Sequence, residues 1–215
     1  MIAISKIRPL LLIAFALPLL AGCFGAAVVG AGAGALLVAD RRPTETYVTD
    51  EGIELRAANV VSQEFGDKVH VNLTSYNRML LITGEAPDAA TKAKVESLVS
   101  KTPNLKSIAN VLAIAGPSSI GGRSNDTYIT SKVKARFVDA NKFAANHVKV
   151  VTEAGVVFLL GLVTQTEAND AVEIARTTGG VQKVVRVFEI ISAQEAKRID
   201  NTAAPATDNK APVRQ

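Results

Sequence analysis

The feature that most constrains the fold is an internal repeat, in which one unit occurs twice with an offset of 76 to 77 residues. The segment VHVNLTSYNRMLLITGEA (69–86) aligns with NHVKVVTEAGVVFLLGLV (146–163), which places His70 opposite His147. Further matched positions are Val71 with Val148, Gly84 with Gly161, and NLKSIANV (104–111) with GVQKVVRV (180–187). A sequence duplicated in this way predicts two copies of one small folding unit.

Each copy alternates helical and strand periodicity in the same order. The pattern predicts an amphipathic helix, a hairpin of two strands, a second helix and a last strand. The first helices are expected at about 52–64 and 126–139, the hairpin turns at Tyr76-Asn77 and Glu153-Ala154-Gly155, the second helices at about 88–101 and 164–178, and the last strands at about 107–114 and 183–190. The predicted fold class is α+β, with helices packed on one face of a three-stranded mixed sheet in each copy.

The repeats define domains of roughly 65 to 70 residues, near the lower limit for an independent hydrophobic core. We expect the first domain at 47–115 and the second at 125–192, joined by a linker at 116–124 that contains Gly and Ser. Two such domains either pack together or stand apart as beads, and the sequence leaves both arrangements open. A copied unit without a matching polar pocket favours binding or scaffolding over catalysis, while a site between the copies stays open.

The first residues have the layout of a signal peptide. A short basic region precedes the apolar stretch LLLIAFALPL (10–19), which is too short to span a bilayer. The sequence LAGC (20–23) then resembles the lipobox of bacterial lipoproteins. We expect residues 1–22 to be removed and Cys23 to become the lipidated, palmitate-carrying first residue; the alternative is a free thiol in an ordinary secretory signal. Because this cysteine is the only one, no disulfide within the chain is expected.

The residues on either side of the repeats predict a tether and a tail. Residues 23–46 begin with a Gly- and Ala-rich run and are expected to form a flexible tether near the membrane. Residues 193–215, rich in Pro, Ala and polar residues from Asn201, are expected to be a disordered tail. Phe24 follows the cysteine, where lipoproteins kept in the inner membrane of enterobacteria usually carry Asp. For a Gram-negative source this predicts an outer-membrane location facing the periplasm.

The repeated motifs resemble those of the BON-domain family. An apolar strand contains a glycine in LLITG (80–84) and FLLGLV (158–163), an Ala- and Glu-containing helix follows, and Gly180-Val181 leads toward a final strand at Val184. With the lipobox, the chain is similar to dual-BON outer-membrane lipoproteins over almost its whole mature length. The resemblance implies a non-enzymatic protein on the inner leaflet of the outer membrane that maintains envelope integrity. It also implies enrichment at the division septum through binding of anionic phospholipids, phosphatidylglycerol and cardiolipin, by the first helix of the second domain.

The stretch NDTYITSKVKARFVDANKF (125–143) contains the helix to which the resemblance assigns lipid binding. Its expected N-cap is Asp126. Two adjacent lines of side chains follow at i, i+4 and i+8, namely Ile129, Val133 and Phe137, and Tyr128, Lys132 and Arg136. The residues predicted to bind phospholipid are Tyr128, Lys132, Arg136 and Phe137. The alternatives are a solvated flank for the cations and a core position for Phe137.

The first copy provides an internal comparison for this helix. Its counterpart EGIELRAANVVSQEF (51–65) carries Arg56 as its only cation, together with three glutamates. Near an anionic leaflet each Lys or Arg contributes about 1 kcal/mol, and an aromatic side chain adds anchoring at the headgroups. The difference in charge therefore favours lipid contact by the second copy. In the enterobacterial members that the chain resembles, the aromatic position is a Trp, so Tyr128 has less area to bury.

Other kinds of site have little support in the sequence. His70 and His147 begin equivalent strands, but their flanks supply no further ligand, so we expect structural roles and no metal site. Ser, Asp and Glu are scattered without the spacing of a nucleophile and its base, which predicts no catalytic residue and no enzyme activity. The glycine-rich run 25–35 follows the expected anchor rather than a strand, so it is not a dinucleotide loop, and no cofactor is expected.

The charge and the compartment restrict the partners. The formal charge of the whole sequence is +4, and removal of Lys6 and Arg8 with the signal peptide lowers it to +2. This near-neutral balance, with few aromatic side chains for stacking, argues against nucleic acid. A protein partner stays open, because a sheet edge or the helix at 52–64 could dock one. The alternative function is therefore an adaptor for an outer-membrane assembly or cell-wall remodelling machine.

Overall fold

The computed structural model describes residues 40–203. These residues belong to one compact unit that begins at Val38. The expected signal peptide 1–22, the expected anchor Cys23, most of the expected tether and residues 204–215 lie outside the described part. No helix within residues 40–203 is long and apolar enough to cross a bilayer.

The first copy of the repeat forms a domain with two helices and a mixed sheet. Its elements are α2 (Thr44–Phe65), the 3-10 turn η2 (Gly66–Lys68), β1 (His70–Tyr76), β2 (Met79–Ala86), α3 (Ala89–Val99), β3 (Ser107–Asn110) and β4 (Ala113–Ile114). Strand β2 is central: it pairs antiparallel with β1 and parallel with both β3 and β4. The last strand, expected as one run at 107–114, is thus interrupted where the side chain of Leu112 turns into the core.

The second copy repeats the same topology. Its elements are α4 (Ile120–Ala140), η3 (Ala145–His147), β5 (Lys149–Glu153), β6 (Val156–Val163), α5 (Gln165–Arg176) and β7 (Lys183–Ile190), followed by α6 (Ala193–Ala203). Strand β6 is central, antiparallel to β5 and parallel to β7. The predicted α+β fold class, with a mixed sheet in each copy, is therefore confirmed.

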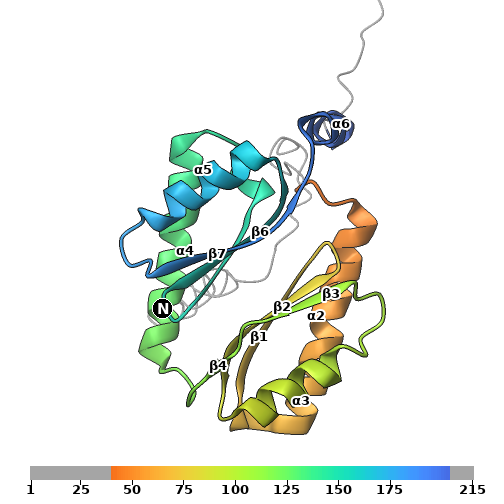
Figure 1. The fold of residues 1–215 in the computed structure, drawn as a ribbon, viewed down its shortest axis with the longest axis vertical. Helices are drawn as coiled ribbons and strands as arrows, with labels where there is room; N and C mark the ends of the chain where they lie inside the picture. Colours follow the sequence, from red (N-terminus) through yellow and green to blue (C-terminus); the bar gives the residue numbers. More distant parts are fainter. Residues whose placement is uncertain (1–39, 204–215) are drawn as a thin grey trace, which may run out of the picture. The chain divides into compact units, whose positions relative to one another are not determined.

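In each domain the two helices cover one face of the sheet (Figure 1). The first core gathers Ile53, Ala57, Val61, Leu80, Ile82, Ala86, Val95, Val99 and Leu112. The second gathers Ile129, Val133, Phe137, Phe143, Val148, Val150, Val157, Leu159, Val163, Ala168, Ala171, Ile174 and Ala175. In both cores, apolar residues at every fourth position of a helix pack against residues at every second position of a strand. This is the periodicity seen in the sequence.

A third apolar cluster joins the two sheets through the faces that the helices leave open. Its buried members are Tyr76, Leu81, Phe158, Leu160 and Leu162, which come from both domains. Hydrogen bonds at the rim also cross between the domains, for example from Asn72 Nδ2 to Glu153 Oε2 at 2.6 Å. The domains therefore pack together and do not stand apart as beads. This also explains why the central strands are buried on both faces.

The glycine shared by the two copies is required by close backbone contact. A Cβ atom on Gly84 would lie 2.1 Å from the carbonyl oxygen of His70, and one on Gly161 would lie 2.4 Å from that of His147. Neither position has room for a side chain, because the backbone at or just before the start of the hairpin's first strand passes directly over it. The glycines of LLITG and FLLGLV are thus packing requirements of the hairpin.

Several expected boundaries differ from those in the structure. Helix α4 begins at Ile120, within the predicted linker, and its N-cap is Ser119 rather than Asp126. Helix α2 begins at Thr44 rather than near residue 52. The added first turns are largely exposed and carry no apolar stripe, so the periodicity that revealed the helices did not extend to them.

The predicted disordered tail is wrong for its first part, because residues 193–203 form helix α6. Its N-terminus is capped by Ser192, whose Oγ accepts a hydrogen bond from Glu195 N. Ala196 is buried, and Asp200 accepts hydrogen bonds from Arg41. A side chain from the other end of the described chain therefore holds this helix in place.

Candidate functional site

The apolar line of α4 lies entirely in the core of the second domain. Ile129, Val133 and Phe137 are all 0% exposed. The ring of Phe137 packs edge-on against that of Phe143, with 5.1 Å between the ring centroids. The prediction that Phe137 binds phospholipid is therefore wrong, since a fully buried side chain offers no surface to a membrane.

Tyr128 and Lys132 lie together on the outer side of α4. The side chain of Tyr128 is 62% exposed. Lys132 Nζ lies 4.6 Å from the centroid of the Tyr128 ring, which is the geometry of a cation–π contact. The same ammonium donates a hydrogen bond to the carbonyl oxygen of Gly179 in the turn after α5. The pair thus presents an amphipathic ring and a positive charge side by side.

Arg136 extends this surface along α4 toward the C-terminal end of α5. Its Nη1 donates to the carbonyl oxygen of Ile174 at 2.8 Å and to the hydroxyls of Thr178 at 2.8 Å and Thr177 at 3.1 Å. Helix C-termini carry unsatisfied carbonyls and a partial negative charge, so a guanidinium is favourable there. Arg136 therefore has a structural role as well as a charge.

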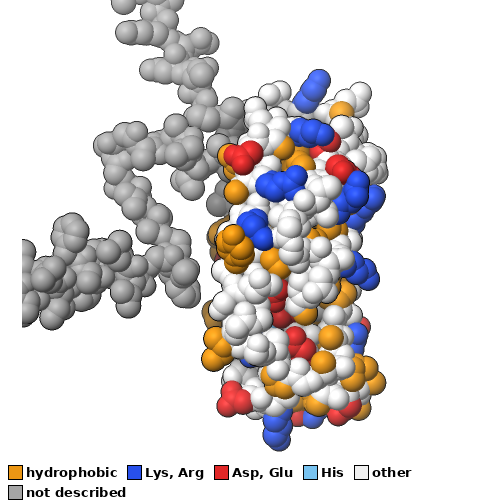
Figure 2. Space-filling model, turned by 90° about the vertical axis from the view of Figure 1, so that its left-hand side faces the viewer, with side chains coloured by type: hydrophobic (Ala, Val, Ile, Leu, Met, Phe, Trp, Pro, Cys, Tyr) orange, Lys and Arg blue, Asp and Glu red, His pale blue; other side chains and the backbone are white. Residues whose placement is uncertain are grey.

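Tyr128, Lys132 and Arg136 are together called the stripe. Its two cations, Lys132 and Arg136, have no carboxylate partner in the described part of the chain. Within residues 40–203, no Asp or Glu oxygen lies within 4.0 Å of Lys132 or Arg136. By contrast, Lys142 pairs with Asp170 at 2.7 Å. Contacts with neutral carbonyls leave the net charge of the stripe at +2, so it remains available to an external anion. Figure 2 shows Lys and Arg side chains gathered over the upper part of this side of the molecule.

The corresponding surface of α2 is different. Alignment of the two helices places Gly52, Arg56 and Val60 at the positions of the stripe. The first domain therefore has no aromatic side chain there and a single cation. Its exposed apolar residues instead include Tyr47, Val48 and Leu55. Because the two helices share a fold but not this surface, α2 is a matched comparison for α4.

Asp126, expected as an N-cap, instead fastens the β5–β6 turn to α4. Its buried carboxylate accepts hydrogen bonds from Ala154 N and Gly155 N, both at 2.8 Å. Both turn residues have positive φ, at 49° and 74°. The equivalent Asp50 in α2 accepts from Asn77 N at 2.8 Å and Arg78 N at 2.7 Å. The repeat therefore preserves a buried aspartate that ties helix to hairpin.

A polar cluster at the domain junction was missed by the sequence reasoning. His70 Nδ1 lies 2.8 Å from Glu85 Oε2, and Glu153 of the second domain lies close by. The expectation that no further ligand converges on His70 is therefore wrong, because both carboxylates come from other strands. Burial raises the pKa of Glu153, with repulsion from Glu85 adding to the effect and the hydrogen bond from Asn72 opposing it.

His147 has different surroundings although it occupies the equivalent position. The nearly buried Arg41 guanidinium donates to both oxygens of Glu167, at 2.7 and 2.9 Å, and to both oxygens of Asp200, at 2.8 and 2.9 Å. It also donates to the carbonyl oxygen of Leu162 at 3.0 Å. Burial lowers the pKa of His147, and the positive charge of Arg41 lowers it further. This cluster is an internal clamp between the start of the described chain and α6.

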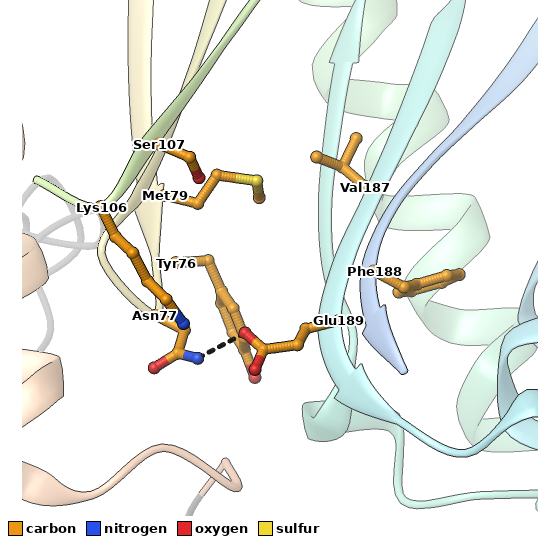
Figure 3. Close-up of a pocket in the computed structure, with 8 residues that line it drawn as sticks. All are labelled: Tyr76, Asn77, Met79, Lys106, Ser107, Val187, Phe188 and Glu189. Carbon is orange, nitrogen blue, oxygen red and sulfur yellow. Dashed lines mark hydrogen bonds between the residues drawn. The ribbon is translucent and has the colours of Figure 1, made fainter. Parts of the chain in front are cut away.

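A small crevice opens between the two sheets, lined by Tyr76, Asn77, Met79, Lys106, Ser107, Val187, Phe188 and Glu189 (Figure 3). Its volume is about 180 Å³. Asn77 Nδ2 donates to Glu189 Oε2 across it at 2.6 Å, which links the domains (Figure 3). Pockets for drug-sized ligands usually measure about 300 to 1,000 Å³. This crevice is therefore better explained as a seam of the interface than as a ligand site.

Comparisons with known proteins agree with the duplicated fold. The model of the BON domain family matches residues 49–116 and 125–192. The chain is 36% identical to Outer membrane lipoprotein DolP of Haemophilus influenzae over 191 residues, covering 87% of this chain and 98% of the relative. It is 30% identical to the 21 kDa hemolysin of Actinobacillus pleuropneumoniae, covering 71% of this chain and 79% of that protein. Osmotically-inducible protein Y of Escherichia coli is 35% identical over 81 residues, which cover 37% of this chain and 39% of that one.

Proposed function

The chain belongs to the BON-domain family as a dual-BON protein similar to DolP, and from this premise we propose that it binds anionic phospholipid through α4 of its second domain. Similarity along nearly the full length of an outer membrane lipoprotein supports the same class here. The chain is then held by lipid on Cys23 and faces the periplasm. Its role is that of a binding protein rather than an enzyme.

The observation that carries the proposal is the unpaired charge of the stripe. Tyr128 is exposed, and Lys132 and Arg136 contact carbonyls and hydroxyls but no described carboxylate. Two cations at about 1 kcal/mol each give a preference of roughly 2 kcal/mol, or about 30-fold, for an anionic over a zwitterionic leaflet. The lipid anchor provides permanent attachment, so the stripe selects lipid composition and does not supply all the binding.

Selection of lipid composition gives the protein its proposed place in the envelope. Phosphatidylglycerol and cardiolipin carry the phosphate charge that the stripe would recognise, and the aromatic ring suits the headgroup zone. We extend the proposal to the inner leaflet of the outer membrane, with enrichment at the division septum and a contribution to envelope integrity. Enrichment then follows from where the anionic lipids gather.

Vesicle binding tests the proposal, using residues 38–215, the part of the chain that lacks the anchor. This protein should bind vesicles that contain phosphatidylglycerol or cardiolipin, should not bind phosphatidylcholine vesicles, and should bind less as salt is raised. Lys132→Glu replaces one attraction by one repulsion, a change of about 2 kcal/mol, which weakens binding roughly 30-fold. The matched control Arg56→Glu on α2 should change binding less than about twofold. Equal losses in the two variants would overturn the assignment to α4.

Charge reversal at Arg136 and at Lys132 should disturb the fold to different extents. Arg136→Glu would place a carboxylate against the carbonyl of Ile174, so it would weaken folding as well as binding. Lys132 donates a hydrogen bond only to Gly179 O in an exposed setting, so its reversal disturbs the fold less. Lys132 is therefore the better position for a charge test.

A second candidate function rests on the exposed apolar side chains of α2. Val48 and Leu55 lie seven residues apart on the helix and are both well exposed, with Tyr47 beside them. Such a surface suits a helical or grooved protein partner, which would make the chain an adaptor for an envelope assembly or remodelling machine. If α2 binds a protein partner, Leu55→Asp should abolish crosslinking to that partner in cells. If α4 binds lipid, the same variant should leave enrichment at the septum unchanged.

A further inference from the structure

The cluster at the domain junction combines one imidazole with two carboxylates. His70 begins β1 and Glu85 lies near the end of β2, while Glu153 ends β5 of the other domain. His70 Nδ1 is 2.8 Å from Glu85 Oε2 and 3.8 Å from Glu153 Oε1. One ligand atom from each of the three lies within 4.8 Å of the others. The packing of the two sheets therefore creates a convergent set of ligands that neither domain holds alone.

The two carboxylates lack a permanent positive partner. Glu85 is 6% exposed and Glu153 is 7% exposed. Within the described chain, no Lys or Arg nitrogen lies within 4.0 Å of either one, and the only basic side chain at that range is His70. Buried charges in proteins are paired or coordinate a metal, because an isolated one is costly. The cluster thus has an anionic excess that a cation would balance.

In the second copy of the repeat, the equivalent histidine lies beside a cationic side chain of the protein itself. At the position of Glu85 the second domain has Leu162, and beside His147 lies the guanidinium of Arg41. Arg41 there forms ion pairs with both Glu167 and Asp200. The cluster around His70 has the carboxylates but not the arginine. Both copies thus place carboxylates near the histidine, but only the cluster around His147 has an arginine paired with them.

We propose that His70, Glu85 and Glu153 bind a divalent transition-metal ion of the Zn²⁺ class. An imidazole with carboxylates suits Zn²⁺ and its neighbours, whereas Ca²⁺ and Mg²⁺ prefer sites made of oxygen alone. Ligand atoms on a tetrahedral zinc lie roughly 3.4 Å apart, so each of these atoms needs to move by about 1 Å or less. Three protein ligands leave a fourth position for water.

The surroundings supply the remaining parts of such a site. Ser118 N donates to Glu85 Oε2 at 3.1 Å, and Asn72 Nδ2 donates to Glu153 Oε2 at 2.6 Å. These donors orient the carboxylates, as outer partners of metal ligands commonly do. A surface hollow of about 550 Å³, lined in part by His70, Asn72 and Glu153, gives the ion a path from solvent. The bound ion would crosslink the two domains where their sheets meet.

The test uses the full-length chain, purified in detergent and stripped of metal with a chelator, and titrates it with Zn²⁺ by calorimetry. One equivalent should bind with micromolar or tighter affinity. His70→Ala and Glu153→Gln should each weaken binding at least about tenfold. The matched control His147→Ala should leave the affinity unchanged. Loss of binding in the control variant as well, or binding that none of the variants alters, would overturn the proposal.

X-ray absorption on the unmodified, zinc-loaded chain keeps the test independent of whether the variants fold. The expected spectrum has one imidazole nitrogen and carboxylate or water oxygens at about 2.0 to 2.2 Å. A sulfur ligand would place the ion at Cys23 and overturn the assignment, as would a first shell without an imidazole. Failure of this site would leave the lipid proposal untouched, because α4 and vesicle binding are not part of the readout.

Discussion

Replacing Asp126 by alanine should destabilise the second domain strongly, although the residue lies inside a helix and far from any helix end. Its carboxylate is the acceptor for Ala154 N and Gly155 N, each at 2.8 Å, and the bond to Gly155 is buried. A hydrogen bond to a charged acceptor contributes about 1.5 to 3 kcal/mol. Losing two, with partial replacement by water at the turn, is expected to lower the free energy of unfolding by about 3 to 4 kcal/mol.

Asp126→Asn keeps the shape of the side chain but removes its negative charge. The amide oxygen can accept from one of the two N–H groups, while its NH₂ group faces the other, so a loss of about 2 kcal/mol is expected. The equivalent Asp50 accepts from Asn77 N, Arg78 N, Ser75 Oγ and Arg42 Nη1. Asp50→Ala should therefore cost more than Asp126→Ala, because it also leaves the buried Arg42 with one carboxylate fewer.

Urea unfolding of each variant gives these free energies, and hydrogen exchange gives a local reading of the same contacts. Exchange of the Ala154 and Gly155 amides should accelerate in Asp126→Ala beyond the global loss of stability. A loss under about 1 kcal/mol, or an Asp50→Ala variant more stable than Asp126→Ala, would refute the view that these aspartates hold helix to hairpin.

Three further predictions concern other clusters. The pKa of His147 is lowered in the folded state from its ordinary value of 6.5, so the folded state binds fewer protons than the unfolded state. Thermal stability should therefore fall as the pH drops below about 6.5. The fall should be smaller in His147→Gln. Arg41→Ala should cost about 3 kcal/mol in urea unfolding, because it removes a buried guanidinium and leaves the half-buried Glu167 unpaired. Asp200→Ala should cost about 1 kcal/mol or less, because the Asp200 side chain is 39% exposed. Tyr128→Trp should tighten binding to phosphatidylglycerol vesicles by roughly 0.5 to 1 kcal/mol through added interfacial area, measured by co-sedimentation, and unchanged binding would exclude contact of this ring with the membrane.

The sequence predicted the features of this fold that follow from short-range periodicity. The strand at 183–190 has the expected bounds, and the repeat itself gave the order of helices and strands in both domains. The start of α4 was missed because its first turn, from Ile120, is exposed and therefore has no apolar pattern. Helix α6 was missed because its contact with Arg41 spans most of the chain.

The functional residues show the same difference between what short-range periodicity predicts and what depends on packing. Tyr128, Lys132 and Arg136 lie on the outer part of α4 as helical geometry requires, whereas Phe137 belongs to the neighbouring line, which is the core. The spacing alone was compatible with either role for Phe137, and packing against Phe143 decides it. Glu85 and Glu153 were not linked to His70, because their meeting depends on how two sheets from different domains pack. Sequence spacing carries no information on that contact.

NMR mapping of the chain from residue 38 onward, with micelles containing phosphatidylglycerol, tests directly whether α4 contacts lipid. Shift changes are expected at Tyr128, Lys132 and Arg136 and in the turn at 177–180 that these cations contact, with little change along α2 at 52–60. Changes concentrated on α2, or none on either helix at saturating lipid, would rule out lipid binding by α4.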